Sequence, residues 1–144
     1  VACGMERVSD ETSVVLVHDG ARPFVSKACI ERVVDAAYKY SAAAPAVRLK
    51  DTVKYVRQDG LVLSTPDRNS LAAVQTPQGF RADLYKEALR RFEGELESFT
   101  DDCSIMERMG NAVYIVDGEY GNIKITTAED LLYAEFLLGG ASHD

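Results

Sequence analysis

A run of four aliphatic residues, Val-Val-Leu-Val at positions 14–17, constrains the fold more than any other stretch of the chain. Because the run is apolar without alternation, it predicts a strand that is buried on both faces, as in a parallel sheet. A helix is predicted next, near residues 26–40, with Ser26 as its N-cap. A short strand around residues 43–47 then completes a βαβ-like unit. We therefore expect an α/β fold.

A β-hairpin is predicted after this unit. Residues 52–57 alternate between polar and apolar side chains, Gln58-Asp59-Gly60 forms a turn, and residues 61–64 run back. One face of the hairpin is too polar for the centre of a sheet. We therefore expect it to project as an arm, over approximately residues 48–70, and to need a partner surface.

The rest of the chain alternates between strand and helix patterns. The predicted elements are a strand at 71–75, a helix at 81–92, a short helix from after Thr100 to Gly110, a strand at 112–116 and a helix at 127–138. The last helix carries two capping-box patterns, Thr126-x-x-Glu129 and Thr127-x-x-Asp130, and the sequence does not choose between them. With no repeat or linker, residues 1–144 are predicted to form a single α/β domain.

Composition excludes several classes of protein. Asp and Glu outnumber Lys and Arg by 23 to 16, and the resulting net charge of −7 repels nucleic acid and anionic membranes. The longest strongly apolar run, at residues 14–17, is far too short to span a bilayer. The three cysteines (Cys3, Cys29 and Cys103) are scattered, so neither a disulfide framework nor a zinc site is predicted. We expect a cytoplasmic protein that binds neither nucleic acid nor membranes.

Three segments follow predicted strands, where open α/β sheets bind ligands. They are residues 19–22, 76–79 and 122–126. In the first, Gly20 would let the backbone approach a ligand closely, and Arg22 could bind a phosphate through two parallel hydrogen bonds. The alternative is an Asp19–Arg22 pair that only braces the strand end, and the spacing leaves both interpretations open.

For other polar residues, the residues alone favour structural interpretations. We interpret His18 as a satisfied core group of the strand, or as a support for another residue, rather than as a base. Lys124, between Ile123 and Ile125, is expected to be a solvated edge lysine on a strand, and Arg68 a charged turn residue. Asp101 and Asp102 could hold a metal, yet acidic residues in a first turn usually serve the helix dipole. Serine-hydrolase and zinc-protease motifs are absent, so the residues alone indicate an anion-binding domain and no reaction.

Taken together, several ordered blocks resemble the 2-C-methyl-D-erythritol 4-phosphate cytidylyltransferase family. The block V-L-V-H-D-G-A-R-P-F at residues 15–24 comes first. Further blocks follow in family order: V-R-L-K-D-T-V-K at 47–54, Asp67-Arg68, T-P-Q-G-F at 76–80, Thr100-Asp101-Asp102, and G-E-Y-G-N-I-K-I-T-T at 118–127. Because the blocks cover nearly the whole chain, the match is specific, whereas a lone V-H-D would not be.

The resemblance implies a Rossmann-like nucleotidyltransferase sheet with a β-hairpin arm that joins two subunits into a homodimer. It implies an enzyme that joins CTP to methylerythritol phosphate with Mg²⁺ and releases pyrophosphate, in the non-mevalonate route to isoprenoids. By motif, Arg68 and Lys124 would position the acceptor phosphate. The substrate pocket would be lined by Asp19, Gly20 and Arg22, with hydrogen bonds from Thr52, Thr76 and Thr100. Thr52 and Arg68, on or beside the arm, would serve the partner's site.

The family's first strand, its Gly-rich loop A-A-G-x-G-x-R and its P-K-Q block, which bind CTP, do not occur in this sequence. We therefore expect the acceptor-binding and dimerising part of the enzyme, truncated at the N-terminus. Two alternatives stay open: ribitol-5-phosphate cytidylyltransferase, which has V-H-D-A-V-R-P where position 21 here is Ala, and a non-catalytic dimeric fragment.

Overall fold

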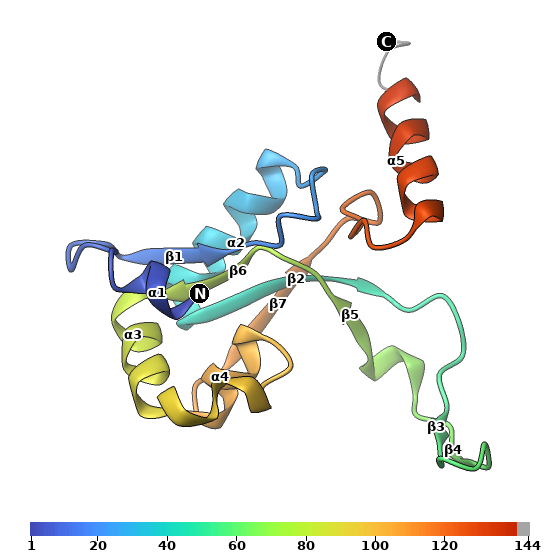
Figure 1. Cartoon of the computed structure of the whole chain (residues 1–144), viewed down its shortest axis with the longest axis horizontal. Helices are drawn as coiled ribbons and strands as arrows, with labels where there is room; N and C mark the ends of the chain where they lie inside the picture. Colours follow the sequence, from blue (N-terminus) through green and yellow to red (C-terminus); the bar gives the residue numbers. More distant parts are fainter. Residues whose placement is uncertain (141–144) are drawn as a thin grey trace.

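The strand that organises the fold is β2 (Ala42–Arg48), which is buried on both faces over its first five residues. In the computed structural model, which describes residues 1–140, Ala42 and Ala44 face one hydrophobic cluster and Ala43 faces another. Figure 1 shows α2 (Lys27–Tyr40) on one face of the sheet and α3 (Ala82–Arg91) and α4 (Asp102–Arg108) on the other. Small side chains on β2 thus let helices approach from both sides, as expected for an α/β fold.

The described residues form helices and strands in the following order along the chain. They are α1 (Ala2–Met5), β1 (Val14–Val17), α2 (Lys27–Tyr40), β2, β3 (Tyr55–Val56), β4 (Val62–Ser64), the 3₁₀ helix η1 (Arg68–Ser70), β5 (Ala72–Val74), β6 (Gln78–Arg81), α3 (Ala82–Arg91), the 3₁₀ helix η2 (Glu93–Ser98), α4 (Asp102–Arg108), β7 (Val113–Asp117) and α5 (Ala128–Gly140). None of these helices is long and apolar enough to cross a membrane.

The sheet is mixed rather than parallel. Its order is β1-β6-β2-β5, and β7 pairs with β2 in parallel, whereas the other pairs are antiparallel. The expectation that residues 14–17 are buried on both faces is wrong, because Leu16 is 37% exposed and, among the described strands, β1 pairs with β6 alone. Strand β6 was not expected, since Pro77 and Gly79 resemble the end of a strand.

Glycine is required at position 79 of β6 because α2 packs closely against the strand there. A Cβ on Gly79 would lie 2.8 Å from Val33 Cγ1 and 3.1 Å from Ala37 Cβ, both on α2. Glycine inside a strand can mark such a close approach instead of a turn. The residue that suggested a turn therefore lets α2 pack against the sheet.

Both predicted helix N-caps are found. Ser26 Oγ accepts a hydrogen bond from Cys29 N at 3.0 Å, which begins α2. Before α5, Asp130 Oδ2 accepts from Thr127 N at 2.9 Å and Thr127 Oγ1 accepts from Asp130 N at 3.3 Å. This reciprocal pair selects Thr127-x-x-Asp130 as the capping box, although Thr126 N also donates to Asp130 at 3.0 Å.

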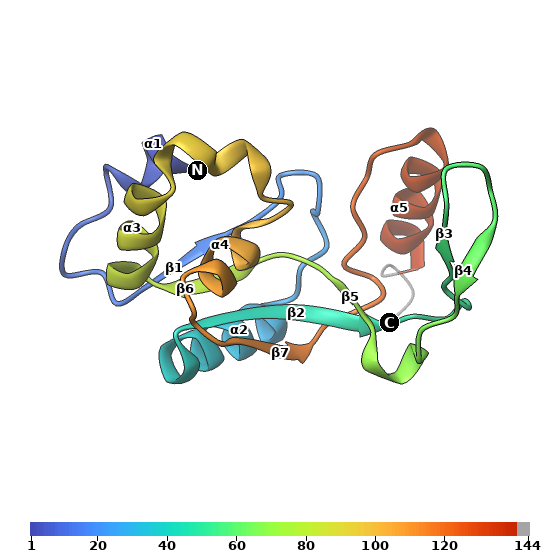
Figure 2. The same cartoon turned by 90° about the horizontal axis from the view of Figure 1, so that it is seen from below.

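The predicted hairpin is formed by β3 and β4, with Gly60 in the turn at φ +87°. Figures 1 and 2 both show this hairpin beyond the ends of β2 and β5, away from the sheet. Residues 50–65 are exposed throughout. We refer to residues 48–70 as the arm.

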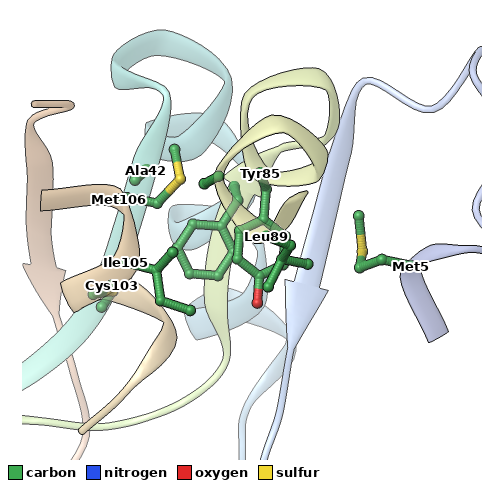
Figure 3. Packing of buried hydrophobic residues seen from close by; sticks show 10 residues of the cluster. Met5, Ala42, Tyr85, Leu89, Cys103, Ile105 and Met106 are labelled. Carbon is green, nitrogen blue, oxygen red and sulfur yellow. The ribbon is translucent and has the colours of Figure 1, made fainter. Parts of the chain in front are cut away.

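The largest hydrophobic cluster lies between the sheet and helices α3 and α4. Phe80 of β6 and Tyr85 of α3 are fully buried, and their rings stack with centroids 4.4 Å apart. Figure 3 shows Cys103, Ile105 and Met106 of α4 facing Tyr85 and Leu89 of α3. Through these contacts α3 and α4 pack against the face of the sheet opposite α2.

Replacing Phe80 with alanine is expected to lower the free energy of unfolding by about 3–5 kcal/mol, because it removes a buried ring and leaves a cavity beside Tyr85. Urea unfolding followed by circular dichroism measures the change. Tyr38→Ala is the matched control, because this ring on α2 is 69% exposed, and its effect is expected to stay within about 0.5 kcal/mol. Equal effects of the two substitutions would contradict this assignment of the core.

Candidate functional site

Three chain segments meet beyond the end of β1. Asp19 follows β1, Thr76 precedes β6, and Lys124 lies in the segment between β7 and α5. Because β1 and β6 are antiparallel, with Val17 opposite Gln78, the residues after β1 lie beside those before β6. The three segments that the strand-end rule selected are therefore brought together. We call Asp19, Arg22, Thr76, Asn122 and Lys124 the strand-end cluster.

Asp19 pairs with two cations in this cluster. Its Oδ2 lies 3.1 Å from Lys124 Nζ and 3.3 Å from Arg22 Nε. Burial raises the pKa of Asp19, but the hydrogen bonds and charges of Lys124 and Arg22 outweigh burial and leave that pKa below its ordinary value. At neutral pH the cluster therefore holds one carboxylate between two cations.

Replacing Asp19 with asparagine is expected to lower the free energy of unfolding by about 1 kcal/mol at neutral pH, since both ion pairs are partly exposed. Because the pKa of Asp19 is lower in the folded state than in the unfolded state, ionised Asp19 stabilises the fold at pH values above its unfolded-state pKa. This contribution is lost as the pH falls through the folded-state pKa of Asp19. The difference between wild type and variant should therefore be constant from about pH 6 to 8 and shrink below about pH 4. Urea unfolding at each pH measures it, with the exposed Asp35→Asn as control. A difference that persists unchanged to pH 3 would contradict the ion pairing.

Lys124 does not lie on a strand, contrary to the prediction. The segment after β7 is irregular, and Ile125 N donates to Ala21 O at 2.9 Å, which ties it to the turn after β1. This contact brings the half-exposed Lys124 side chain to Asp19. The expected strand position is therefore wrong, whereas the side chain is exposed as expected and has, in addition, a specific partner.

Backbone hydrogen bonds fix the remaining members of the cluster. Asp19 N donates to Thr76 Oγ1 at 3.0 Å, and Asn122 Nδ2 donates to Thr76 O at 2.8 Å. Arg22 Nη1 donates to Asn122 O at 2.8 Å, so Arg22 bridges Asp19 and Asn122. Apart from its two chain neighbours, no atom of the described residues lies within 4 Å of a Cβ built on Gly20. The space beside Gly20 is thus open to a ligand.

Gln75, which the sequence analysis missed, holds the segment that carries Lys124. Its Oε1 accepts from Glu119 N at 3.2 Å, and its Nε2 donates to Glu119 O at 2.8 Å and to Asn122 O at 3.3 Å. A Cβ on Gly118 would lie 2.6 Å from Gln75 Oε1 and 3.0 Å from the Ala46 backbone. The hydrogen bonds of Gln75 to this segment, which we call the Gln75 clasp, therefore require glycine at position 118.

Glu119 also ties this segment to α2. Its carboxylate accepts from Ser26 Oγ at 2.7 Å and from Arg32 Nη2 at 3.0 Å. The Ser26 hydrogen bond lowers the pKa of Glu119 most, with Arg32 adding to it against the effect of burial. Ser26 was recognised in the sequence as an N-cap only, because its second partner is distant in the chain.

Thr100 is exposed and precedes Asp101, the N-cap of α4. Asp101 Oδ1 accepts from Ser104 N at 2.9 Å, and Gln78 Nε2 donates to Asp101 Oδ2 at 2.8 Å. Since Gln78 lies opposite Val17, Thr100 is held on the side of the sheet where β1 ends. Asp101 acts as a cap, as acidic first-turn residues usually do. Within residues 1–140, no group of three or more His, Cys, Asp or Glu side chains could hold a metal ion.

Thr52 and Arg68 lie apart from the strand-end cluster. Both are exposed residues of the arm, and Arg68 Nη1 donates to Lys50 O at 2.7 Å within it. Figure 1 shows the arm on the opposite side of β2 and β5 from the segment before α5. Within one chain, these two predicted site residues and Lys124 therefore do not form one site.

Comparisons with known proteins identify what this arrangement resembles. A sequence model of the IspD family, 2-C-methyl-D-erythritol 4-phosphate cytidylyltransferase, matches residues 1–140. The protein of that name from Geobacillus thermodenitrificans is 54% identical over 126 residues, which cover 87% of this chain and 54% of the relative. The one from Clostridium botulinum is 46% identical over 127 residues, covering 88% of this chain and 57% of the relative.

Solved structures agree with the sequence comparisons. The crystal structure of 4-diphosphocytidyl-2C-methyl-D-erythritol synthase from Anaerococcus prevotii has a TM-score of 0.88 at 35% identity, covering 96% of this chain and 62% of that one. The cytidylyltransferase structure from Thermus thermophilus has a TM-score of 0.84 at 36% identity, covering 95% and 66%. The predicted resemblance and nucleotidyltransferase fold are confirmed. The chain spans little more than half the length of the curated relatives it matches.

Proposed function

Because the chain belongs to the 2-C-methyl-D-erythritol 4-phosphate cytidylyltransferase family, we propose that it serves transfer of CMP from CTP to 2-C-methyl-D-erythritol 4-phosphate, in isoprenoid synthesis by the non-mevalonate route. The observation that carries the proposal is the strand-end cluster. There the cations Lys124 and Arg22 flank Asp19 beside an open backbone at Gly20. Cations suit the acceptor's phosphate, and a carboxylate suits its hydroxyl groups.

The chemistry requires positioning rather than a base. An oxygen of the acceptor phosphate attacks the α-phosphorus of CTP in line, a new phosphorus–oxygen bond forms, and pyrophosphate leaves with the electron pair of the broken bond. Since the attacking phosphate is already an anion, no proton has to be removed from it. Lys124 and Arg68 hold that phosphate, Asp19 and Arg22 line the pocket near Gly20, and the hydroxyls of Thr52, Thr76 and Thr100 form hydrogen bonds with the substrate.

The divalent cation implied by the family, Mg²⁺, would neutralise charge on the nucleotide phosphates. Among residues 1–140 no cluster of three or more potential ligands occurs, and Asp19 is already paired with Lys124 and Arg22. The described residues therefore do not fit a metal site of their own.

The arm supports assembly into a homodimer. Six of its apolar side chains are at least 36% exposed: Val53, Tyr55, Val56, Leu61, Val62 and Leu63. Such a group on a projecting hairpin fits burial against a second copy of the chain. In that dimer, Thr52 and Arg68 of one subunit would complete the strand-end cluster of the other. The cytoplasm, with its supply of CTP, is the compartment that this function requires.

Deleting residues 52–64 is expected to convert dimers into monomers in sedimentation velocity experiments. The fold should persist, because these residues are exposed, and the two legs of the arm that remain are adjacent, with Arg68 Nη1 donating to Lys50 O at 2.7 Å. A milder variant, Val56→Asp, places a charge on the same surface and should weaken the dimer. A deleted chain that still sediments as a dimer would refute the arm as the interface.

Pyrophosphate release from CTP and Mg²⁺, run in parallel with methylerythritol phosphate and ribitol phosphate, tests the proposed function. Release with methylerythritol phosphate alone supports it, whereas release with ribitol phosphate alone would identify the rival activity. If neither acceptor gives release, calorimetry with methylerythritol phosphate distinguishes an acceptor-binding, non-catalytic chain from one without this specificity. The names of the relatives favour the methylerythritol substrate.

A further inference from the structure

His18 is bonded through both ring nitrogens, although its side chain is exposed at the end of β1. Nδ1 lies 2.9 Å from Thr76 Oγ1, and Nε2 lies 3.0 Å from the carbonyl oxygen of Arg22. Both partners belong to residues of the strand-end cluster. The ring therefore lies between the segment before β6 and the turn after β1.

The partners determine which nitrogen of the neutral ring carries the proton. A carbonyl oxygen can only accept, so Nε2 donates to Arg22 O, and Nδ1 of the neutral ring then accepts. The Thr76 hydroxyl donates to Nδ1, and its oxygen accepts from Asp19 N at 3.0 Å. This arrangement orients the hydroxyl and connects His18 to the backbone of both Asp19 and Arg22.

We propose that His18 is a positioning residue for the acceptor, which fixes the Thr76 hydroxyl and the turn that carries Asp19 and Arg22. The inference rests on the proposed function for the identity of the acceptor. His18 acts through Thr76 and Arg22 and takes no proton from the substrate. Loss of the His18 ring therefore weakens acceptor binding because the Thr76 hydroxyl and the turn that carries Asp19 and Arg22 are no longer fixed. No catalytic group is lost.

The hydrogen-bond chain has a spectroscopic test that requires no ligand. The sequence contains two histidines, so ¹⁵N-labelled protein gives few ring signals, and the His18→Phe variant assigns those of His18. At pH 8 we expect the Nε2–H form, with an Nδ1 signal that shifts in Thr76→Val. A predominant Nδ1–H form, or an Nδ1 signal unaffected by Thr76→Val, would overturn the proposed orientation.

Calorimetry with methylerythritol phosphate tests the consequence. His18→Phe keeps a ring of similar shape without nitrogens and is expected to weaken binding about tenfold, as the loss of one or two hydrogen bonds would. His18→Gln, whose amide can still donate to Arg22 O, should recover part of the affinity. Combined with Thr76→Val, the loss should be smaller than the product of the single losses, because both substitutions break the same chain.

The outcomes separate the two proposals. If the wild type binds methylerythritol phosphate and His18→Phe binds it equally well, the positioning role is wrong and the proposed function stands. If the wild type binds no polyol phosphate, the proposed function fails, and the acceptor role of His18 fails with it. Unfolding in urea provides the structural control, since an exposed ring should affect stability little.

Discussion

In protein that turns over CTP and methylerythritol phosphate, replacing Lys124 with methionine is expected to lower that turnover by about 100- to 1,000-fold, the range found when one fixed donor to a developing charge is removed. Methionine keeps most of the length of the side chain but removes the charge that would hold the attacking phosphate. Lys124 Nζ is suited to this task because Asp19, 3.1 Å away, fixes its position while nearly half of its side chain stays exposed.

The control for this substitution is Lys27→Met, since Lys27 is 89% exposed on α2 and pairs only across one helical turn with Glu31. Its turnover should match that of the wild type. Unfolding must be measured for both variants, because a lysine that merely neutralised Asp19 would contribute at most about 1 kcal/mol to stability. Turnover of Lys124→Met within threefold of the wild type, with reduced stability, would assign Lys124 that bracing role alone.

Local patterns were sufficient to predict most elements of the fold. The N-cap at Ser26, the turn at Gly60 and the capping box at Thr127 each depend on residues that are neighbours in the sequence. The failures concern strand pairing. Strand β1 is at the edge of the described sheet, and β6 lies between β1 and β2, because partners distant in the chain decide which strand is central.

Gly79 shows why such information is hard to read from one sequence. A glycine before an aromatic residue is consistent with a turn, and only the position of α2, 2.8 Å from its missing Cβ, reveals a close approach. The same holds for Gly118 and Gln75. Gln75 holds the Lys124 segment through hydrogen bonds with Glu119, and Gly118 allows a close approach to the Ala46 backbone. No spacing rule specifies these contacts.

The site was predictable at the level of segments but not of side-chain partners. The rule that ligands bind at strand ends selected the three segments that meet. It could not predict that Lys124 leaves the strand and pairs with Asp19, since that contact depends on the hydrogen bond between Ile125 and Ala21. Nor could it place the arm, whose residues Thr52 and Arg68 came from the family resemblance alone.

The separation of Arg68 from Lys124 within one chain leads to a second large effect. Arg68→Met and Lys124→Met are each expected to be nearly inactive alone, yet mixed dimers of the two variants should regain activity. In such a dimer one site receives Lys124 from the first subunit and Arg68 from the arm of the second, so that site is intact. With random pairing, about half of the dimers are mixed and each has one working site, giving about a quarter of wild-type turnover.

Co-expression of the two variants with different affinity tags isolates the mixed dimers, which should reach about half of wild-type turnover per dimer because one of two symmetric sites works. Dimers in which every chain carries both substitutions are the control and should remain inactive. If Arg68 served the site of its own subunit, every site in the mixed dimer would lack one cation, and isolated mixed dimers would be as inactive as their parents. The experiment therefore distinguishes a site shared between subunits from one completed by folding the arm back onto its own chain.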